Sequence, residues 1–145
     1  MGLLERLAPH LPYVRRYARA LTGEQLAGDR YVRASLEALA AGEAQLPPNL
    51  TPRVALYHVF HTIWSGTGAK LDPTDADAMH GGDASSRLMR ITPRSRQAFL
   101  LTSLEGFSPA EAAQILGCNN TEVEQLISTA QTELDAELAT QVLII

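Results

Sequence analysis

The sequence predicts an all-α protein made of two small helical lobes that are joined by a polar linker. Apolar residues recur at helical spacing on both sides of the segment 65–91, which is itself rich in Gly, Ser, Asp and Ala. Near the end of the chain, residues 108–138 carry the capping and turn residues of a helix pair. We therefore place a first lobe at 1–64, the linker at 65–91 and a second lobe at 92–140.

The first lobe is predicted to begin with two helices. One spans residues 3–21, but Pro9 and Pro12 break or kink its beginning, so its regular part starts near Leu11. Its apolar residues gather on one side and its arginines lie mostly on the other. The second helix spans 27–41 and is followed by a glycine, a residue that commonly ends helices.

A third helix, predicted at 52–64, is the most apolar segment of the chain and is expected at the centre of the first lobe. His58 and His61 stand three residues apart on it and could face a metal ion together. No acid or cysteine of this segment completes a ligand set, so we interpret both histidines as packing or partner-facing residues and predict no metal site.

The second lobe is predicted to open with a helix from Thr92 to Glu105, because Thr-Pro is a helix-starting pair and Gly106 can end the helix. Leu100, Leu101 and Leu104 are expected to face inward. This helix leads directly into the capped pair that follows.

Residues 108–138 are predicted to form a helix-turn-helix. Ser108 and Glu111 form a capping-box pattern, and Gly117 can adopt the left-handed conformation that ends the first helix. Asn119 can cap the second helix, in which apolar residues recur at helical spacing. Helix-turn-helix motifs normally place their second helix in the major groove of DNA.

The distribution of charge along the chain argues against DNA binding by this motif. All 12 Lys and Arg residues lie in residues 1–96, together with 9 acids, whereas residues 97–145 hold 7 acids and no base. Affinity for nucleic acid comes largely from Lys and Arg that neutralise phosphates. The second lobe is therefore predicted to be repelled by DNA, and no nucleic-acid partner is expected.

The sequence contains no motif of a catalytic or cofactor site. A Gly-rich phosphate loop and the patterns GxSxG, HExxH and CxxC are all missing, and the four histidines have no evident nucleophile or carboxylate nearby in sequence. We therefore predict a protein that is not an enzyme and that has no catalytic residues, no cofactor and no metal.

The ends of the chain and its one cysteine bear on location. Residues 1–16 carry charges throughout, which excludes a signal peptide or membrane span there, and Cys118 alone forms no internal disulfide, so we expect a cytoplasmic protein. Residues 141–145, QVLII, are predicted to form a β-strand. Since an all-helical domain has no use for one isolated strand, we expect the chain to stop just inside a following domain.

These segments resemble the extracytoplasmic-function sigma factors, which carry a promoter −10 domain (region 2) followed by a −35 domain (region 4). The resemblance covers nearly the whole chain and is strongest at 92–134. The positions that fit the region 4 pattern are Arg94, Leu100, Leu101, Leu104, Glu105, Gly106, Phe107, Glu111, Ala112, Ala113, Leu116, Gly117, Val123, Ala130 and Leu134.

The departures from that family fall on its functional surfaces. Where true members carry Lys-Ser-Arg and further arginines, this chain has Glu124, Gln125, Leu126, Thr129 and Gln131. In region 2, the pair used to contact polymerase is replaced by Arg33 and Ala34, and Ser-Gly-Thr-Gly stands where a basic, aromatic tract is expected. The pattern of the fold is kept while its nucleic-acid contacts are not.

This combination is similar to the PhyR family of general stress response regulators, in which a sigma-like domain precedes a phosphorylatable receiver domain. The resemblance implies an anti-anti-sigma factor that sequesters a NepR-type anti-sigma factor by partner switching and so releases the true sigma factor. It also implies a contact with the chain's own receiver domain. The alternative is a genuine DNA-binding sigma factor or helix-turn-helix transcription regulator.

Leu126 is the residue we favour for contacting such a partner, because an apolar side chain on the flank of the second motif helix has little reason to be exposed unless something covers it. It could equally extend the core. The other candidates for partner binding are Gln125, Glu122, Thr129, Phe107, Tyr31 and Phe60, and core roles explain the three aromatic residues well.

Overall fold

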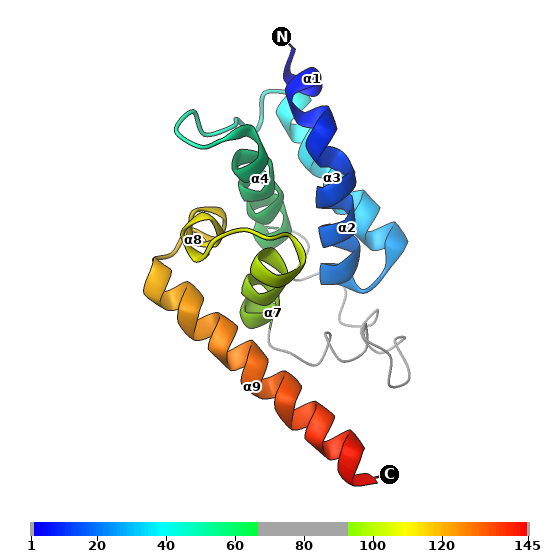
Figure 1. Ribbon diagram of the computed structural model, residues 1–145. Helices are drawn as coiled ribbons and strands as arrows, with labels where there is room; N and C mark the ends of the chain where they lie inside the picture. The colour runs from blue at the N-terminus through cyan, green and yellow to red at the C-terminus, as the bar shows by residue number, and fades with distance from the viewer. Residues whose placement is uncertain (1, 67–92, 145) are drawn as a thin grey trace.

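The computed structural model describes residues 2–66 and 93–144, and in these ranges every regular element is helical (Figure 1). The predicted all-α fold class is thereby confirmed. In chain order the elements are α1 (Leu3–Leu7), η1 (Ala8–His10), α2 (Leu11–Thr22), α3 (Gln25–Ala40), α4 (Pro52–Gly66), α7 (Pro93–Phe99), η3 (Leu100–Leu104), α8 (Pro109–Leu116) and α9 (Asn120–Ile144).

The helices of the first lobe begin and end within two residues of their predicted positions. Regular α2 starts at Leu11, as predicted, after a short 3-10 turn that contains Pro9. It ends at Gly23, whose φ of 77° lies in the left-handed region and lets its N–H donate to the carbonyl of Arg19 at 2.8 Å. The predicted linker 65–91 lies outside the described residues except at its first two positions, which still belong to α4.

Helix α3 approaches α2 closely at Gly28. A Cβ atom at this position would lie 2.7 Å from the backbone nitrogen and 2.8 Å from the Cα of Arg19. Only glycine allows two helix backbones to come this near. Alongside this contact, the guanidinium of Arg19 on α2 donates to both carboxylate oxygens of Asp29 on α3, at 3.0 and 3.1 Å.

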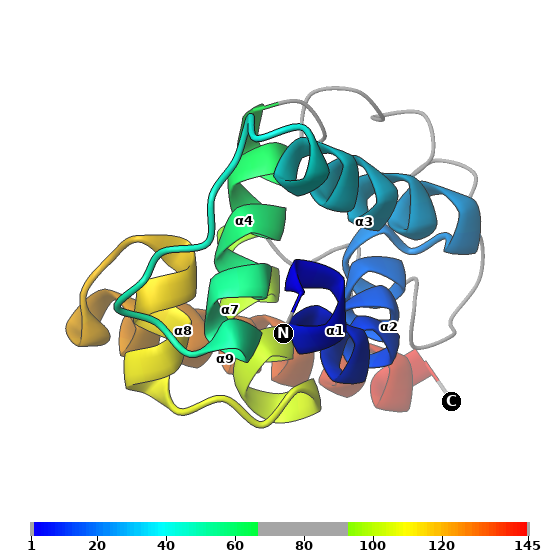
Figure 2. The ribbon, with the colours of Figure 1, turned by 90° about the horizontal axis from the view of Figure 1, so that it is seen from above.

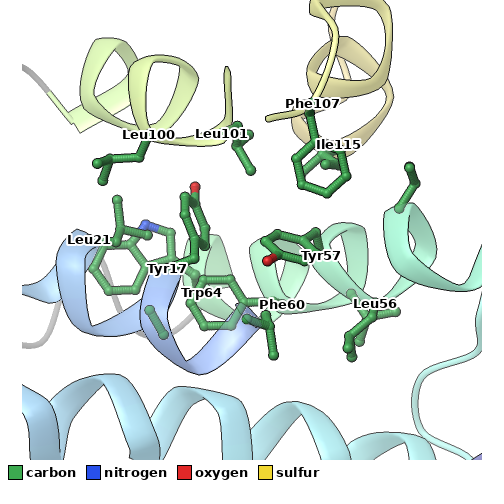
Figure 3. Packing of buried hydrophobic residues seen from close by; sticks show 14 of the residues in the cluster. Tyr17, Leu21, Leu56, Tyr57, Phe60, Trp64, Leu100, Leu101, Phe107 and Ile115 are labelled. Atoms are coloured by element: carbon green, nitrogen blue, oxygen red, sulfur yellow. The ribbon is translucent and has the colours of Figure 1, made fainter. Parts of the chain in front are cut away.

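The two lobes share one hydrophobic core. Figure 2 shows α8 beside α4 and α9 running from α8 past α7, and the close-up in Figure 3 shows buried side chains of both lobes facing one another. The fully buried members of this core include Tyr17, Tyr57 and Phe60 from the first lobe and Leu101 and Ile115 from the second. Burial of this apolar surface holds the lobes together.

The helix that opens the second lobe differs from its prediction. After Phe99 it widens into a turn of π-helix, in which the N–H of Glu105 donates to the carbonyl of Leu100 at 3.0 Å. A π-turn adds one residue and rotates the side chains that follow it. The prediction that Leu104 faces inward is therefore wrong. Its side chain is 38% exposed, and Glu105 takes the buried position instead.

The helix-turn-helix is formed as predicted. The capping box is complete, with the N–H of Glu111 donating to Ser108 Oγ at 3.1 Å and the N–H of Ser108 donating to Glu111 Oε1 at 3.0 Å. Gly117 has a φ of 71° and ends α8, and Asn119 Oδ1 accepts from the N–H of Glu122 at 2.8 Å at the start of α9.

Helix α9 continues to Ile144, so the β-strand predicted at 141–145 is wrong for residues 141–144, which are helical. The segment QVLII has a single polar residue followed by four apolar ones, which is too short a pattern to separate a strand from a helix. Once a helix is nucleated, each further residue adds a hydrogen bond at little cost, so α9 extends through the run. Among the described residues, no helix combines the length and the apolar composition needed to cross a membrane.

Candidate functional site

The exposed face of the first half of α9 carries four of the residues predicted to bind a partner. Glu122, Gln125 and Thr129 are exposed, and Leu126 between them is half-buried. Their spacing places them on one side of the helix, whereas Val123 and Ala130 are fully buried against the rest of the lobe. The structure therefore brings these four residues together on the surface where a DNA-binding motif would meet the major groove.

Leu126 stands at the border between core and surface. Its partial burial fits both the core extension and the partner contact that its sequence position suggested. Its neighbours on the exposed side are polar or acidic, so any partner would meet one apolar side chain surrounded by hydrogen-bonding groups. Such a setting suits a protein and is unsuited to a phosphate backbone.

The three aromatic candidates lie elsewhere, inside the shared core. Tyr31 packs edge-on against Trp64 at 5.0 Å between ring centroids. Phe60 is fully buried, and Phe107 packs edge-on against Tyr57 at 4.8 Å. The structure does not bring these side chains together with the α9 face, and their role in partner binding stays a prediction.

The cations of the second lobe do not favour DNA either. In its described part the lobe has two, Arg94 and Arg96, and both precede the motif. Arg96 is buried, and burial lowers the pKa of its guanidinium. Buried in this way, Arg96 cannot neutralise a phosphate. Arg94 is exposed but precedes the motif, so the helix-turn-helix itself has an acidic surface and no cation of its own.

On the first lobe, α2 and α3 enclose an apolar hollow with a basic rim. Its volume is about 510 Å³, and Leu26, which is 65% exposed, stands at its edge. Its walls are built from the apolar residues Leu11, Leu26, Val32 and Leu36 and the charged residues Arg15, Asp29, Arg30 and Arg33. Three arginines against one aspartate make the rim net positive, the opposite of the sign of α9.

The two histidines of α4 have separate surroundings. His61 Nε2 shares a hydrogen bond of 2.6 Å with the buried hydroxyl of Tyr17. Burial, with a smaller contribution from the nearby His58, lowers the pKa of His61 to about 3, so its imidazole is neutral. His58 instead places Nδ1 3.2 Å from the carbonyl oxygen of Gln114 and 3.3 Å from that of Ile115, at the end of α8.

A cluster of polar contacts joins the two lobes. Its centre is Glu105, which the sequence did not single out as a functional residue. Arg16 of α2 donates through Nε and Nη2 to Glu105 Oε2, at 3.1 and 3.0 Å. The hydroxyl of Tyr57 on α4 donates to Glu105 Oε1. These partners lie 89 and 48 residues away in sequence, so local spacing gives no signal of their meeting.

The chain matches two family models, and both concern one group of regulators. Residues 7–61 match the "Sigma2 domain of PhyR", and residues 88–137 match "Response regulator PhyR, sigma-like domain". Among curated proteins, the chain is 43% identical over 145 residues to the phyllosphere-induced regulator PhyR of Methylorubrum extorquens, covering all of this chain and 54% of that protein. It thus spans about half the length of this relative.

Solved structures give the same result. The chain is 66% identical to the PhyR stress response regulator solved at 1.25 Å resolution, covering 94% of this chain and 52% of the other with a TM-score of 0.75. It is 45% identical to the PhyRSL protein in the PhyRSL–NepR complex from Sphingomonas sp. Fr1, covering 94% of this chain and 88% of the other with a TM-score of 0.71.

Proposed function

The chain belongs to the PhyR family, as a sigma-like domain, and from this premise we propose that it is a sigma-factor mimic that binds an anti-sigma protein of NepR type. The observation that carries the proposal is the second helix of its helix-turn-helix, which keeps the fold and has no Lys or Arg. A mimic needs only the surface that the anti-sigma protein contacts, so residues that would serve promoter DNA are dispensable.

The proposed mechanism is partner switching. The chain sequesters the anti-sigma protein, and the genuine sigma factor, no longer held, recruits polymerase and activates general stress response transcription. Phosphorylation of a receiver domain would control when this surface becomes available, and the receiver itself would contact the sigma-like domain. This role requires binding and no chemical step, so the chain acts as a cytoplasmic regulator without catalytic residues.

The two surfaces described above support a partner that contacts both lobes. The face of α9 around Leu126 offers one apolar anchor among polar groups, and the hollow between α2 and α3 offers an apolar floor with a net positive rim. An amphipathic helix with acidic flanks fits that hollow, because its apolar side chains would be buried and its charges would meet arginines.

The decisive measurement is calorimetric titration of the chain with the NepR protein of Sphingomonas sp. Fr1. We expect a complex with a Kd below micromolar, and no heat of binding at micromolar concentrations would refute the proposal. The alternative, a DNA-binding sigma factor, is tested by a mobility shift with promoter duplex DNA at physiological salt. We expect no shift, and binding that weakens steeply with added salt would favour the alternative.

Leu126→Glu tests the place of contact, with Gln131→Glu as its matched control. Both add one negative charge to α9, but Gln131 lies off the face that carries Leu126. Loss of a buried apolar anchor typically weakens a complex by tenfold or more, so we expect that effect for Leu126→Glu and about twofold or less for the control. An unchanged Kd together with a lowered Tm for Leu126→Glu would place Leu126 in the core.

A further inference from the structure

Glu105 is a buried carboxylate whose polar groups are bonded to both lobes. Its side chain has no exposed surface, although its partner Arg16 is about half exposed. One carboxylate oxygen accepts from Tyr57 and the other accepts twice from Arg16. Its carbonyl oxygen accepts from Arg53, and its own N–H donates to Leu100. Glu105 thus ties α2 and α4 of the first lobe to the second.

These bonds act at the base of the helix-turn-helix. Glu105 ends the π-turn, Gly106 follows with a φ of 76°, and Phe107 then leads into α8. The guanidinium of Arg53 lies 4.0 Å from the centre of the Phe107 ring, so the same segment is held from a second side. Any change in the position of Glu105 would move the start of α8, and with it α9.

The apolar core and this polar cluster make different contributions. Hydrophobic contact holds the lobes together, but it depends little on direction, so apolar faces can shift over one another at small cost. Hydrogen bonds between a guanidinium and a carboxylate require a fixed distance and plane. Buried ionic groups add little net stability, and in several systems they instead select one arrangement of the surrounding elements.

We propose that Glu105 is a positioning residue that sets the orientation of the helix-turn-helix on the first lobe, so that the surfaces of both lobes are preformed for one partner. This inference rests on the proposed function, because its consequence for affinity requires a partner that spans the lobes. A surface already in its bound arrangement avoids the cost of ordering on binding.

The test compares Glu105→Gln with Glu43→Gln. Both remove one negative charge, but Glu43 is exposed and lies in the turn that follows α3. Residual dipolar couplings of backbone amides in α2–α4 and in α7–α9 report the angle between the lobes without any partner. Calorimetric titration with the NepR protein of Sphingomonas sp. Fr1 reports the effect on affinity.

For Glu105→Gln, we expect the couplings measured within each lobe to agree with the helices of that lobe, but a single orientation of the two lobes should no longer fit both sets. We also expect the Kd for NepR to rise about tenfold or more. That rise follows if the binding-competent arrangement falls to a tenth of the population. Glu43→Gln should match the original protein in both measurements. An unchanged lobe angle in Glu105→Gln would overturn the inference.

Two milder variants keep the inference testable if Glu105→Gln does not fold. Tyr57→Phe removes one donor and keeps the ring in the core, and Arg16→Gln removes the exposed half of the ion pair. Each should loosen the lobe angle to a smaller degree, and an angle unchanged in both would contradict the inference. If the original protein binds no NepR, the proposed function fails, while the couplings still decide whether Glu105 sets the angle.

Discussion

Acidification between pH 7 and pH 5 should destabilise this protein through His61. The imidazole is buried against Tyr17 and Phe60, and burial lowers its pKa to about 3 from an ordinary value of 6.5. The folded state therefore resists protonation, whereas the unfolded chain takes up a proton as the pH falls through 6.5. Because the unfolded state binds more protons in this range, the free energy of unfolding must fall as the pH falls.

The size of the effect follows from the two pKa values. Each unit of pKa difference corresponds to about 1.4 kcal/mol, so the full loss would approach about 5 kcal/mol once the pH reaches 3. Between pH 7 and pH 5 the linkage relation gives a loss of about 2 kcal/mol. This is a large part of the stability of a small domain, and it falls in a window above the usual titration of Asp and Glu.

The assay is urea unfolding followed by circular dichroism at pH 7, 6 and 5, for the original protein, for His61→Gln and for His10→Gln. Glutamine offers Tyr17 a hydrogen-bonding group but does not titrate, so His61→Gln should be less stable at pH 7 and should lose about 2 kcal/mol less on acidification. His10→Gln, altered at the end of η1, is the control for the same substitution at a histidine outside the core. If the difference between His61→Gln and the original protein is the same at pH 7 and pH 5, the reasoning is refuted.

Two further substitutions test the local structure by changes in the free energy of unfolding. Gly28→Ala should lower the free energy of unfolding by about 1–3 kcal/mol or more, because its Cβ would lie 2.7 Å from the backbone of Arg19. The control, Gly2→Ala, should be nearly neutral, since a Cβ there meets nothing within 4 Å. Equal effects of the two substitutions would mean that α2 and α3 lie further apart. Ser108→Ala removes the side-chain acceptor of the capping box and should cost about 1 kcal/mol, with Ser128→Ala on the exposed side of α9 as the control. A Ser108→Ala protein as stable as the original would show that the cap contributes nothing.

The helices of this fold follow from local rules, which is why the sequence predicted most of them. Capping at Ser108, the glycine at 117 and the prolines on either side of Leu11 each act within a few residues, so the same physics is visible in the sequence and in the structure. The predictions failed where the local signal was weak or was overridden. The π-turn after Phe99 moved Leu104 outward, and residues 141–144, predicted as part of a strand, joined α9.

The contact between the lobes could not be predicted, because it depends on residues far apart in the chain. No sequence feature near Arg16 or Tyr57 indicates that either residue binds the carboxylate of Glu105, which lies 89 and 48 residues later in the chain. Arg16 was expected on the polar side of its helix, and a glutamate before a glycine is an ordinary helix end. Only the packing of α2, α4 and η3 shows that Glu105 is buried and that both of its carboxylate oxygens accept hydrogen bonds.

The fold and the charge of this protein support separate conclusions about what it can bind. Val123, Ala130 and Ile115 are buried where α9 packs against α7 and α8, so they support the motif's fold and none of them would touch DNA. Binding to DNA would instead depend on side chains exposed to solvent, and on the first turns of α9 these include Glu122, Glu124 and Gln125, none of which is basic. Since apolar periodicity and caps determine the fold while surface charge selects the ligand, one helix-turn-helix can be kept intact as its partner changes from a polyanion to a protein. The arginines of the first lobe are consistent with the proposed protein partner, because three of them line the apolar hollow that we propose to bind an acidic helix.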